Sequence, residues 1–283
     1  MLFARNRSTL GLWVLLIASA VLVVPAEGKS KARSVGKALN LEGYRLVFRE
    51  EFDGELDIAA WGPNTRWIAH TPWKGDFGDA TFADPAPGFP FTIHKGTLRI
   101  EARKDPNAPS GQRPWRSGLL ASNSPNGSGF ALQYGYFEIS AKLPDSKGVW
   151  PAFWLSTSSD RTDPHSADDG LIEIDVFEFY GFPESYHAVV HVWKPKPHRE
   201  LGERISTPKR DASSGFHTYG ALVTPEWIIF YRDRREVWRT ETPKEHKRPL
   251  MILLNLALGG GWPIYRVKNP SYMFVDYVRA YTK

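Results

Sequence analysis

The chain has 283 residues and no cysteine, with 42% hydrophobic and 24% charged residues. The formal net charge of +5 comes entirely from the N-terminal region, because Arg5 and Arg7 contribute +2 and residues 27–40 contribute four positive charges less one negative, or +3. The remainder is formally neutral and long enough to bury an ample core without disulfides, so the high isoelectric point gives no argument for nucleic acid or for an acidic substrate.

Residues 1–26 have the pattern of a secretory signal peptide. Two arginines precede an uncharged apolar stretch from Leu10 to Val24, and small residues around Pro25 offer a cleavage point. The stretch is short for a membrane span, so an uncleaved anchor is the alternative. We therefore expect a secreted, periplasmic or extracellular protein with no stable membrane partner after cleavage. Residues 27–40 are basic and aperiodic, and we expect them to form a flexible leader.

Residues 41–283 predict a single β-rich domain. Short alternating or apolar runs are separated by turn signals, and amphipathic helix signals are nearly absent. The expected strands and hairpins cover 44–52, 92–103, 117–120, 134–143, 149–155, 188–193, 216–222, 227–233, 236–240, 250–258 and 273–281. The run at 250–258 is nearly all apolar and predicts a strand buried on both faces, and 273–281 is expected to close the sheet. This pattern predicts an all-β fold of two packed antiparallel sheets.

Three connecting regions are polar, basic or rich in aromatic residues. Residues 61–91 contain many Gly, Pro and aromatic residues. Residues 156–170 form a polar connection whose Asp and His spacing matches no metal motif. Residues 194–210 form a basic loop with six basic and two acidic residues. That loop can hold an anionic saccharide, or it can be an ordinary exposed loop.

The most informative stretch runs from Gly170 to Gly181 and contains three carboxylates in an apolar, β-branched run. Side chains alternate along a strand, so Glu173 and Asp175 share a face while Glu178 would point the other way. One extra residue in a β-bulge near Val176 or Phe177 restores all three to one face. The alternative is a solvated acidic strand face, which the flanking apolar residues and the repulsion between like charges disfavour.

Paired carboxylates suit the cleavage of glycosidic bonds. One acid must be ionised to attack the anomeric carbon, and the other must hold a proton for the leaving oxygen. A third carboxylate between them, Asp175, can help to separate their pKa values. The Cα atoms of Glu173 and Glu178 would lie about 13 Å apart along the strand. Retaining enzymes hold the carboxyl groups about 5–5.5 Å apart, so strand curvature and side-chain lean must close the gap.

The motif Glu-Ile-Asp-Val-Phe-Glu resembles the signature of glycoside hydrolase family 16, in the bulged form of laminarinase-like and agarase-like members. Further stretches resemble the same family, in its order, between about residues 44 and 281. They are Leu46–Gly54, Gly135–Pro144, Trp150–Leu155, Phe216–Tyr219, Pro249–Gly260 and Val275–Tyr281. The resemblance implies a concanavalin A-like β-jelly roll with an open cleft on its concave sheet. It also implies that 41–283 is the catalytic domain of a retaining endo-acting β-glycosidase, a monomer whose partner is a polysaccharide.

In that family the matching residues have distinct roles. The resemblance implies that Glu173 is the nucleophile, that Glu178 is the general acid and then base, and that Asp175 orients and tunes them. It places the strand of Trp150 and Trp154 beside the acidic strand, lining the cleft.

Further substrate contacts are expected around the cleft. His191 is a candidate substrate contact or partner of the acid/base, and Trp262 a sugar platform at the end of a buried strand. Trp67 and Trp73 are candidates to stack on sugar rings, while Trp61 is expected to pack beneath its loop.

The resemblance implies no cofactor for catalysis but allows a structural Ca²⁺ ion. Its ligands would be the Asp276 side chain and the backbone carbonyls of Glu51 and Gly96, oxygen ligands of the type that Ca²⁺ takes. Asp276 can equally be a plain strand carboxylate.

Three other functions are compatible with parts of this pattern. A transglycosylase uses the same covalent intermediate but transfers it to a sugar. A carbohydrate-binding sandwich uses the same fold, but it gains nothing from three crowded acids. A polysaccharide lyase fits the acids less well. The substrate stays open between β-1,3-glucan, mixed-linkage β-glucan, galactans and exopolysaccharides.

Overall fold

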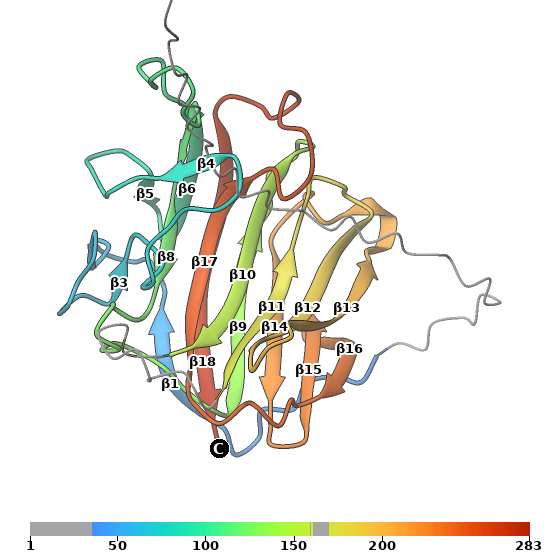
Figure 1. Ribbon diagram of the computed structural model, residues 1–283. Coiled ribbons are helices and arrows are strands. Elements are labelled where there is room, and N and C mark those ends of the chain that lie inside the picture. The colour runs from blue at the N-terminus through green and yellow to red at the C-terminus, as the bar shows by residue number, and fades with distance from the viewer. Residues whose placement is uncertain (1–35, 159, 161–169) are drawn as a thin grey trace, which may run out of the picture. The chain divides into compact units, whose positions relative to one another are not determined.

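The computed structural model describes residues 36–158, 160 and 170–283, which form two β-sheets packed face to face (Figure 1). The expected signal peptide at 1–26, residues 27–35 of the expected leader and most of the connection at 156–170 lie outside these residues. Within the described ranges the chain contains one short 3₁₀ helix, Pro208–Arg210, and no helix with the length and apolarity needed to cross a membrane.

One sheet has ten strands. Its main path runs through β16 (Arg235–Glu241), β15 (Trp227–Arg232), β14 (His217–Val223), β9 (Gly135–Lys142), β18 (Ser271–Thr282), β6 (Thr97–Lys104), β7 (Trp115–Ser117) and β4 (Ala80–Phe82). Off this path, β1 (Arg45–Glu50) pairs with β18 and β5 (Phe91–His94) pairs with β6. β18 therefore lies in the interior of the sheet between β9 and β6, and the expectation that it closes the sheet was wrong. The pattern of a strand does not specify its neighbours, which are distant in sequence here.

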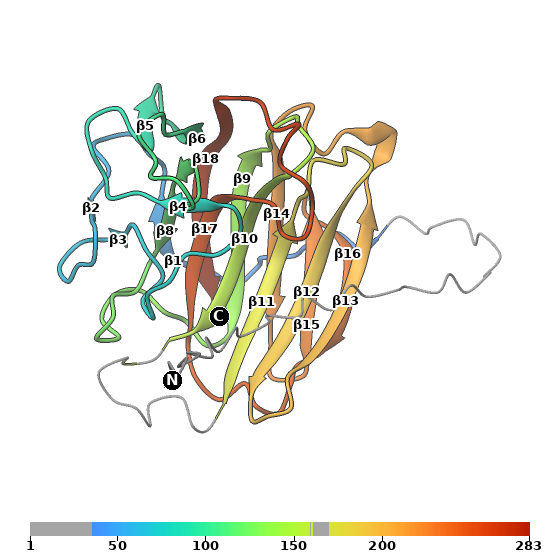
Figure 2. The same ribbon diagram turned by 45° about the horizontal axis from the view of Figure 1, so that its top comes forward.

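The other sheet has eight strands. Its order is β13 (Arg199–Ser206), β12 (Ser185–Lys194), β11 (Leu171–Glu178), β10 (Val149–Thr157), β17 (Leu250–Leu258), β8 (Leu119–Ala121), β3 (Trp67–Ile68) and β2 (Ile58–Ala59). Figures 1 and 2 both show β17, β10, β11, β12 and β13 side by side, with the ten-stranded sheet behind them. Part of the expected basic loop at 194–210 is thus the edge strand β13. Most of its side chains are exposed, so its sequence lacks the alternation of apolar and polar residues that predicts a strand.

β17 is buried on both faces, as its apolar run predicts. Leu250, Ile252, Leu254 and other even-numbered residues pack in the main core between the sheets. Met251, Leu253 and Ala257 pack in a second, smaller cluster on the opposite face of the same strand. Partly buried aromatic residues from other segments, Phe77 and Trp150, pack against this second cluster. The second cluster supports one end of the cleft described below.

Candidate active site

β11 contains a β-bulge at the position that the acidic motif requires. Phe177 pairs with Phe153 of β10, but Asp175 pairs with the next residue, Trp154, so Val176 is the extra residue. The pairing with β12 shifts over the same interval. The bulge is therefore where the sequence predicts it, and it turns Glu178 to the face of the two preceding acids.

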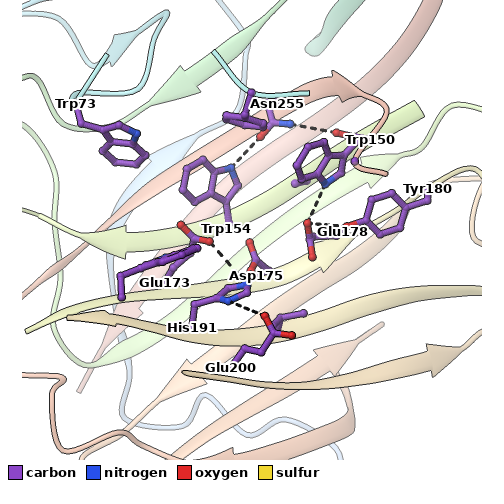
Figure 3. Close-up of a pocket in the computed structure, with 15 residues that line it drawn as sticks. Trp73, Trp150, Trp154, Glu173, Asp175, Glu178, Tyr180, His191, Glu200 and Asn255 are labelled. Carbon is purple, nitrogen blue, oxygen red and sulfur yellow. Dashed lines mark hydrogen bonds and ion pairs between the residues drawn. The ribbon is translucent and has the colours of Figure 1, made fainter. Parts of the chain in front are cut away.

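That face of β11 lines a cleft with a volume of ≈ 560 Å³ (Figure 3). All three carboxylates, Glu173, Asp175 and Glu178, line this hollow, which we call the main cleft. The opposite face of β11, including Ile172, Ile174 and Phe177, packs into the main core. Alternation along the strand, corrected by the bulge, separates the acids from the apolar side chains.

Glu178 receives two hydrogen bonds on the same oxygen. Trp150 Nε1 donates to Glu178 Oε1 over 2.8 Å, and Tyr180 Oη donates to the same atom over 2.9 Å. Burial raises the pKa of Glu178, while these two donors lower it. Gly260 closes over the pair, because a Cβ atom there would lie 2.6 Å from the Tyr180 ring and 2.9 Å from the Trp150 ring. Glu178 is thus held by neutral donors of fixed position.

Glu173 and Asp175 have charged neighbours instead. Burial raises the pKa of Glu173 well above its usual value, and the charge of Asp175 raises it further. Burial also raises the pKa of Asp175, as does the charge of Glu178. His191 Nε2 lies 3.3 Å from Asp175 Oδ2 and 4.0 Å from Glu173 Oε1. Asp175 Oδ2 is buried and accepts no hydrogen bond from the described residues. Its contact with His191 Nε2 therefore lacks the geometry of a hydrogen bond.

His191 belongs to a stack of rings at the β12–β13 side of the cleft. Its Nδ1 lies 3.0 Å from His198 Nε2 and 3.5 Å from Glu200 Oε2. The Trp193 ring lies against both imidazoles, with its centroid 5.2 Å from His191 and 4.1 Å from His198, and the two imidazole centroids are themselves 5.2 Å apart. The ligand atoms of His191, His198 and Glu200 are close enough to hold a cation. The hydrogen bond between His191 and His198 and the stacking of their rings explain why these ligand atoms lie close together without an ion.

Aromatic side chains form the opposite wall of the main cleft. Trp150, Trp154 and Trp73 all line it, as the sequence predicts for the first two and allows for the third. Trp154 Nε1 donates to Asn255 Oδ1 over 2.8 Å, and Asn255 Nδ2 donates to the Trp150 backbone carbonyl over 3.2 Å. Asn255 of β17 therefore fixes both tryptophans of β10.

Three other tryptophans lie elsewhere. Trp67 is fully buried in the main core, where it packs edge-on against Phe48 and donates to Glu50 Oε2 over 3.2 Å. Its prediction as a sugar platform was wrong, because a loop rich in aromatic residues does not show which rings turn inward. Trp61 is 36% exposed and stacks on His70, so the expectation that it packs beneath its loop was also wrong. Trp262 is 44% exposed and lies beside the main cleft without lining it.

The residues of the expected Ca²⁺ site come from three neighbouring places in the ten-stranded sheet. Asp276 is the exposed extra residue of a bulge in β18. Glu51 directly follows β1, whose Glu50 pairs with Val278 of β18. Gly96 directly precedes β6, whose Leu98 pairs with Val275. Strand pairing therefore brings one carboxylate and two backbone segments to the same part of the sheet, and this set of oxygen donors fits Ca²⁺.

Sequence reasoning missed several residues of the main cleft. Tyr180 follows Glu178 by two positions, and strand alternation would have placed it on the same face. Asn255 is the only polar residue of the run at 250–258, which is itself a signal. Glu200 and His198 gave no usable signal, because the pairing of β13 with β12 brings them to His191.

Comparisons with known proteins agree with this geometry. The family model described as glycosyl hydrolases family 16 matches residues 89–279. The chain is 33% identical over 276 residues to the endo-1,3-1,4-beta-glycanase EglC of Rhizobium meliloti, covering 89% of this chain and 54% of EglC. It is 37% identical over 202 residues to ExsH of the same organism, covering 68% of this chain and 40% of ExsH. The chain thus spans about half the length of these curated relatives.

Solved structures show the same architecture. SCLam, a non-specific endo-beta-1,3(4)-glucanase, superposes with a TM-score of 0.69 at 26% identity, covering 88% of this chain and 95% of SCLam. A substituted variant of LamA of Zobellia galactanivorans, in complex with laminaritriose and laminaritetraose, superposes with a TM-score of 0.65 at 26% identity, covering 84% of this chain and 98% of that one. The two-sheet sandwich is therefore the jelly roll of these proteins, as predicted, and the chain belongs to glycosyl hydrolase family 16.

Proposed function

We propose that the chain is a retaining endo-β-glucanase. The observation that carries the proposal is the bulge in β11, which places Glu173 and Glu178 on one face of a cleft with an aromatic wall. Cleavage with retention needs two carboxyl groups with different tasks, and the surroundings of these two differ: the neutral donors Trp150 and Tyr180 hold Glu178, whereas Asp175 and His191 lie beside Glu173.

In the first step Glu173 attacks the anomeric carbon, and the bond to the leaving sugar oxygen breaks. Glu178 gives its proton to that oxygen as the bond breaks, which leaves a covalent glycosyl-enzyme ester and an ionised Glu178. In the second step Glu178 takes a proton from a water molecule, whose oxygen attacks the anomeric carbon and releases Glu173. Because Trp150 and Tyr180 occupy Glu178 Oε1, the transferred proton is carried by Oε2.

Asp175 is proposed as a positioning residue between the two glutamates. Three buried carboxylates cannot all ionise without strong repulsion, so they titrate as a coupled group. A proton held by Asp175 allows Glu173 to ionise, and the raised pKa of Asp175 supports this assignment. His191 lies 3.3 Å from Asp175 and 4.0 Å from Glu173, and its proximity lowers the pKa of Glu173, which favours the ionised nucleophile.

The proposed substrates are β-1,3-linked and mixed β-1,3-1,4-linked glucans. The relatives EglC and ExsH are named endo-1,3-1,4-beta-glycanases, and SCLam acts as an endo-beta-1,3(4)-glucanase. An SCLam variant also binds a 1,3-beta-D-cellobiosyl-glucose at its active site. The aromatic wall of Trp73, Trp150 and Trp154 offers the flat apolar surfaces that sugar rings prefer.

The test is digestion of a panel of neutral polysaccharides with sizing of the products and proton NMR during the first turnovers. We expect short oligosaccharides from internal cuts, with the β-anomer of the new reducing end appearing first. Products longer than the substrate would instead identify a transglycosylase. An initial α-anomer, or no cleavage of any β-glucan, would contradict the proposal.

We further propose that the protein acts outside the cytoplasm and binds one structural Ca²⁺ ion. Export is supported by the pattern of residues 1–26, and a fusion of this segment to a reporter enzyme tests it. For Ca²⁺, moving from excess chelator to Ca²⁺ at 100 times its dissociation constant should stabilise the fold by about 2.7 kcal/mol. The Asp276→Ala variant should lose this response, and an equal response in that variant would place the ion elsewhere.

A further inference from the structure

A second hollow lies beside the main cleft and has the opposite charge. Its volume is ≈ 220 Å³, and Lys147, Phe182, Trp262, Tyr265 and Arg266 contribute to its lining. We call it the side pocket. Its lining contains two cations and no carboxylate, whereas the main cleft is lined by four carboxylates and by no lysine or arginine.

The side pocket lies next to the acid/base end of the main cleft. Tyr180, which holds Glu178, has its ring centroid 6.5 Å from that of Trp262. Trp262 in turn packs edge-on against Phe182, with ring centroids 4.6 Å apart. A glycan that occupies the main cleft can therefore extend a residue or a substituent over Tyr180 onto Trp262.

The exposed rings of the side pocket stand on an anchored loop. Ile264 packs against the main core and Val267 is 8% exposed, with Val267 N donating to Ile264 O over 3.0 Å. Gly148 lies so close that a Cβ atom there would be 2.4 Å from the Pro263 carbonyl oxygen. Trp262, directly before Pro263, and Tyr265, between Ile264 and Val267, are 44% and 77% exposed. Two large aromatic rings are thus held in solvent by the buried residues of their own loop.

Lys147 and Arg266 lie over aromatic rings and not against acids. Lys147 Nζ lies 5.2 Å from the centroid of Phe182, and Arg266 Cζ lies 5.4 Å from the centroid of Tyr265. Neither takes part in an ion pair within the described ranges. The neighbouring Lys268, in contrast, faces Asp145 with Nζ and Oδ2 3.4 Å apart. The positive charge of the side pocket is therefore available to a ligand.

We propose that the side pocket binds an anionic substituent, a carboxylate or a sulfate, on the glycan held in the main cleft. This inference rests on the glycanase function proposed above. The rings of Trp262 and Tyr265 offer apolar faces to a sugar, and the fork of Arg266 matches the oxygens of a carboxylate or sulfate. The main cleft is lined by acidic side chains and by no lysine or arginine, so the side pocket is where such a group is attracted.

The test compares binding of three polymers: a mixed-linkage β-glucan, its carboxymethylated derivative and its sulfated derivative. Affinity gels that contain each polymer report binding without turnover, and every protein carries Glu178→Gln to prevent cleavage. We expect tighter binding to at least one anionic polymer than to the neutral one, and we expect added salt to weaken this preference. The polymer that is preferred identifies the carboxylate or the sulfate.

Arg266→Ala should reduce the preference for the anionic polymer, and the double variant Lys147→Ala/Arg266→Ala should reduce it roughly threefold to tenfold. Lys268→Ala removes the same charge from the same loop outside the side pocket, and it should leave the preference unchanged. Equal binding of all three polymers, or equal losses in Arg266→Ala and Lys268→Ala, would overturn the proposal. If the unsubstituted protein cleaves no β-glucan but the charge preference follows Arg266, the glucanase function fails while the anionic site stands.

Discussion

On its core face β11 places Ile172, Ile174 and Phe177 among apolar side chains, and on its cleft face it places three carboxylates that are buried or partly buried. Burial stabilises the first face, since removing apolar surface from water is favourable. On the second face burial raises the pKa values of the acids and disfavours their charged forms.

The bulge at Val176 makes this contrast possible. Without it, Glu178 would point into the core with Ile172 and Ile174, as strict alternation requires. With it, Val176 and Phe177 both pack in the main core and Glu178 reaches the cleft. The strand therefore carries reactive carboxyl groups on its cleft face at a cost in charge repulsion. Substitutions on the core face and on the cleft face should have opposite effects on the free energy of unfolding.

The largest effects should come from the two glutamates, and they should differ from each other. Glu173→Gln removes the nucleophile and should lower kcat by several orders of magnitude on every substrate. Glu178→Gln removes the proton donor and should do the same on polysaccharide. With an aryl glycoside whose leaving group needs no proton, the Glu178 variant should retain much more activity in the first step.

Azide separates the two roles further. In Glu178→Ala it should restore turnover of the aryl glycoside and yield a β-glycosyl azide, because the covalent intermediate still forms on Glu173. In Glu173→Ala azide can attack only from the opposite side to the leaving group, so the product should be the α-azide. The reverse pattern of azide products would exchange the assignments of the two residues.

The second prediction compares Trp67 with Trp73, which the sequence treats alike. Trp67→Ala should lower the free energy of unfolding by about 3–5 kcal/mol, because Trp67 is fully buried in the main core. Trp73→Ala should leave unfolding nearly unchanged and raise KM, because Trp73 is 37% exposed and lines the main cleft. Denaturant unfolding and kinetics on both variants check this, and similar stability losses would place both rings in the core.

This pair also shows where sequence reasoning stopped. Most of the strands, the bulge and the acid row follow from local patterns: alternation, turn residues and the odd spacing between Asp175 and Glu178, whereas β3, β4 and β13 lie in regions expected to be connections. The direction of a ring in an irregular segment depends on contacts with distant strands, as Trp67 with Phe48 shows. Those contacts leave no local pattern.

The third prediction sets neighbouring residues of β11 against each other. Ile174→Ala should lower the free energy of unfolding by about 2–5 kcal/mol. Asp175→Asn should raise it by about 0.5–2 kcal/mol at neutral pH, while lowering activity, because the buried Asp175 carboxyl with its raised pKa must take up a proton on folding and asparagine need not.

The gain in Asp175→Asn should depend on pH. The pKa of Asp175 is higher in the folded protein than in the unfolded chain, so wild-type stability is lost as the pH rises past the ordinary carboxyl pKa. Asparagine does not titrate, so the gain should disappear at low pH, where aspartate is protonated in both states. Denaturant unfolding of both proteins across the pH range measures the difference. A gain that is equal at all pH values would point to packing and not to charge.

For the cleft, local patterns predicted the acids and the β10 tryptophans but not what holds them. Glu200 reaches His191 only through the pairing of β12 with β13, and Gly260 reaches Tyr180 only through the loop after β17. These contacts join segments that carry no common motif. Tyr180 is the exception, because its position two residues after Glu178 predicts its face, and it therefore gives the sharpest remaining test.

The smallest expected effect is that of Tyr180→Phe, which removes one of the two donors to Glu178 Oε1. A donor to a carboxylate favours its ionised form and lowers its pKa, so the loss of this donor should raise the pKa of Glu178. Glu178 then keeps its proton to higher pH, and the alkaline limb of the kcat/KM profile should move upward in pH. Tyr277→Phe is a matched control, because Tyr277 Oη donates to Glu138 Oε1 over the same 2.9 Å outside the cleft. That variant should leave the pH profile in place. A downward shift in Tyr180→Phe, or equal shifts in both variants, would show that Tyr180 does not set the protonation of the acid.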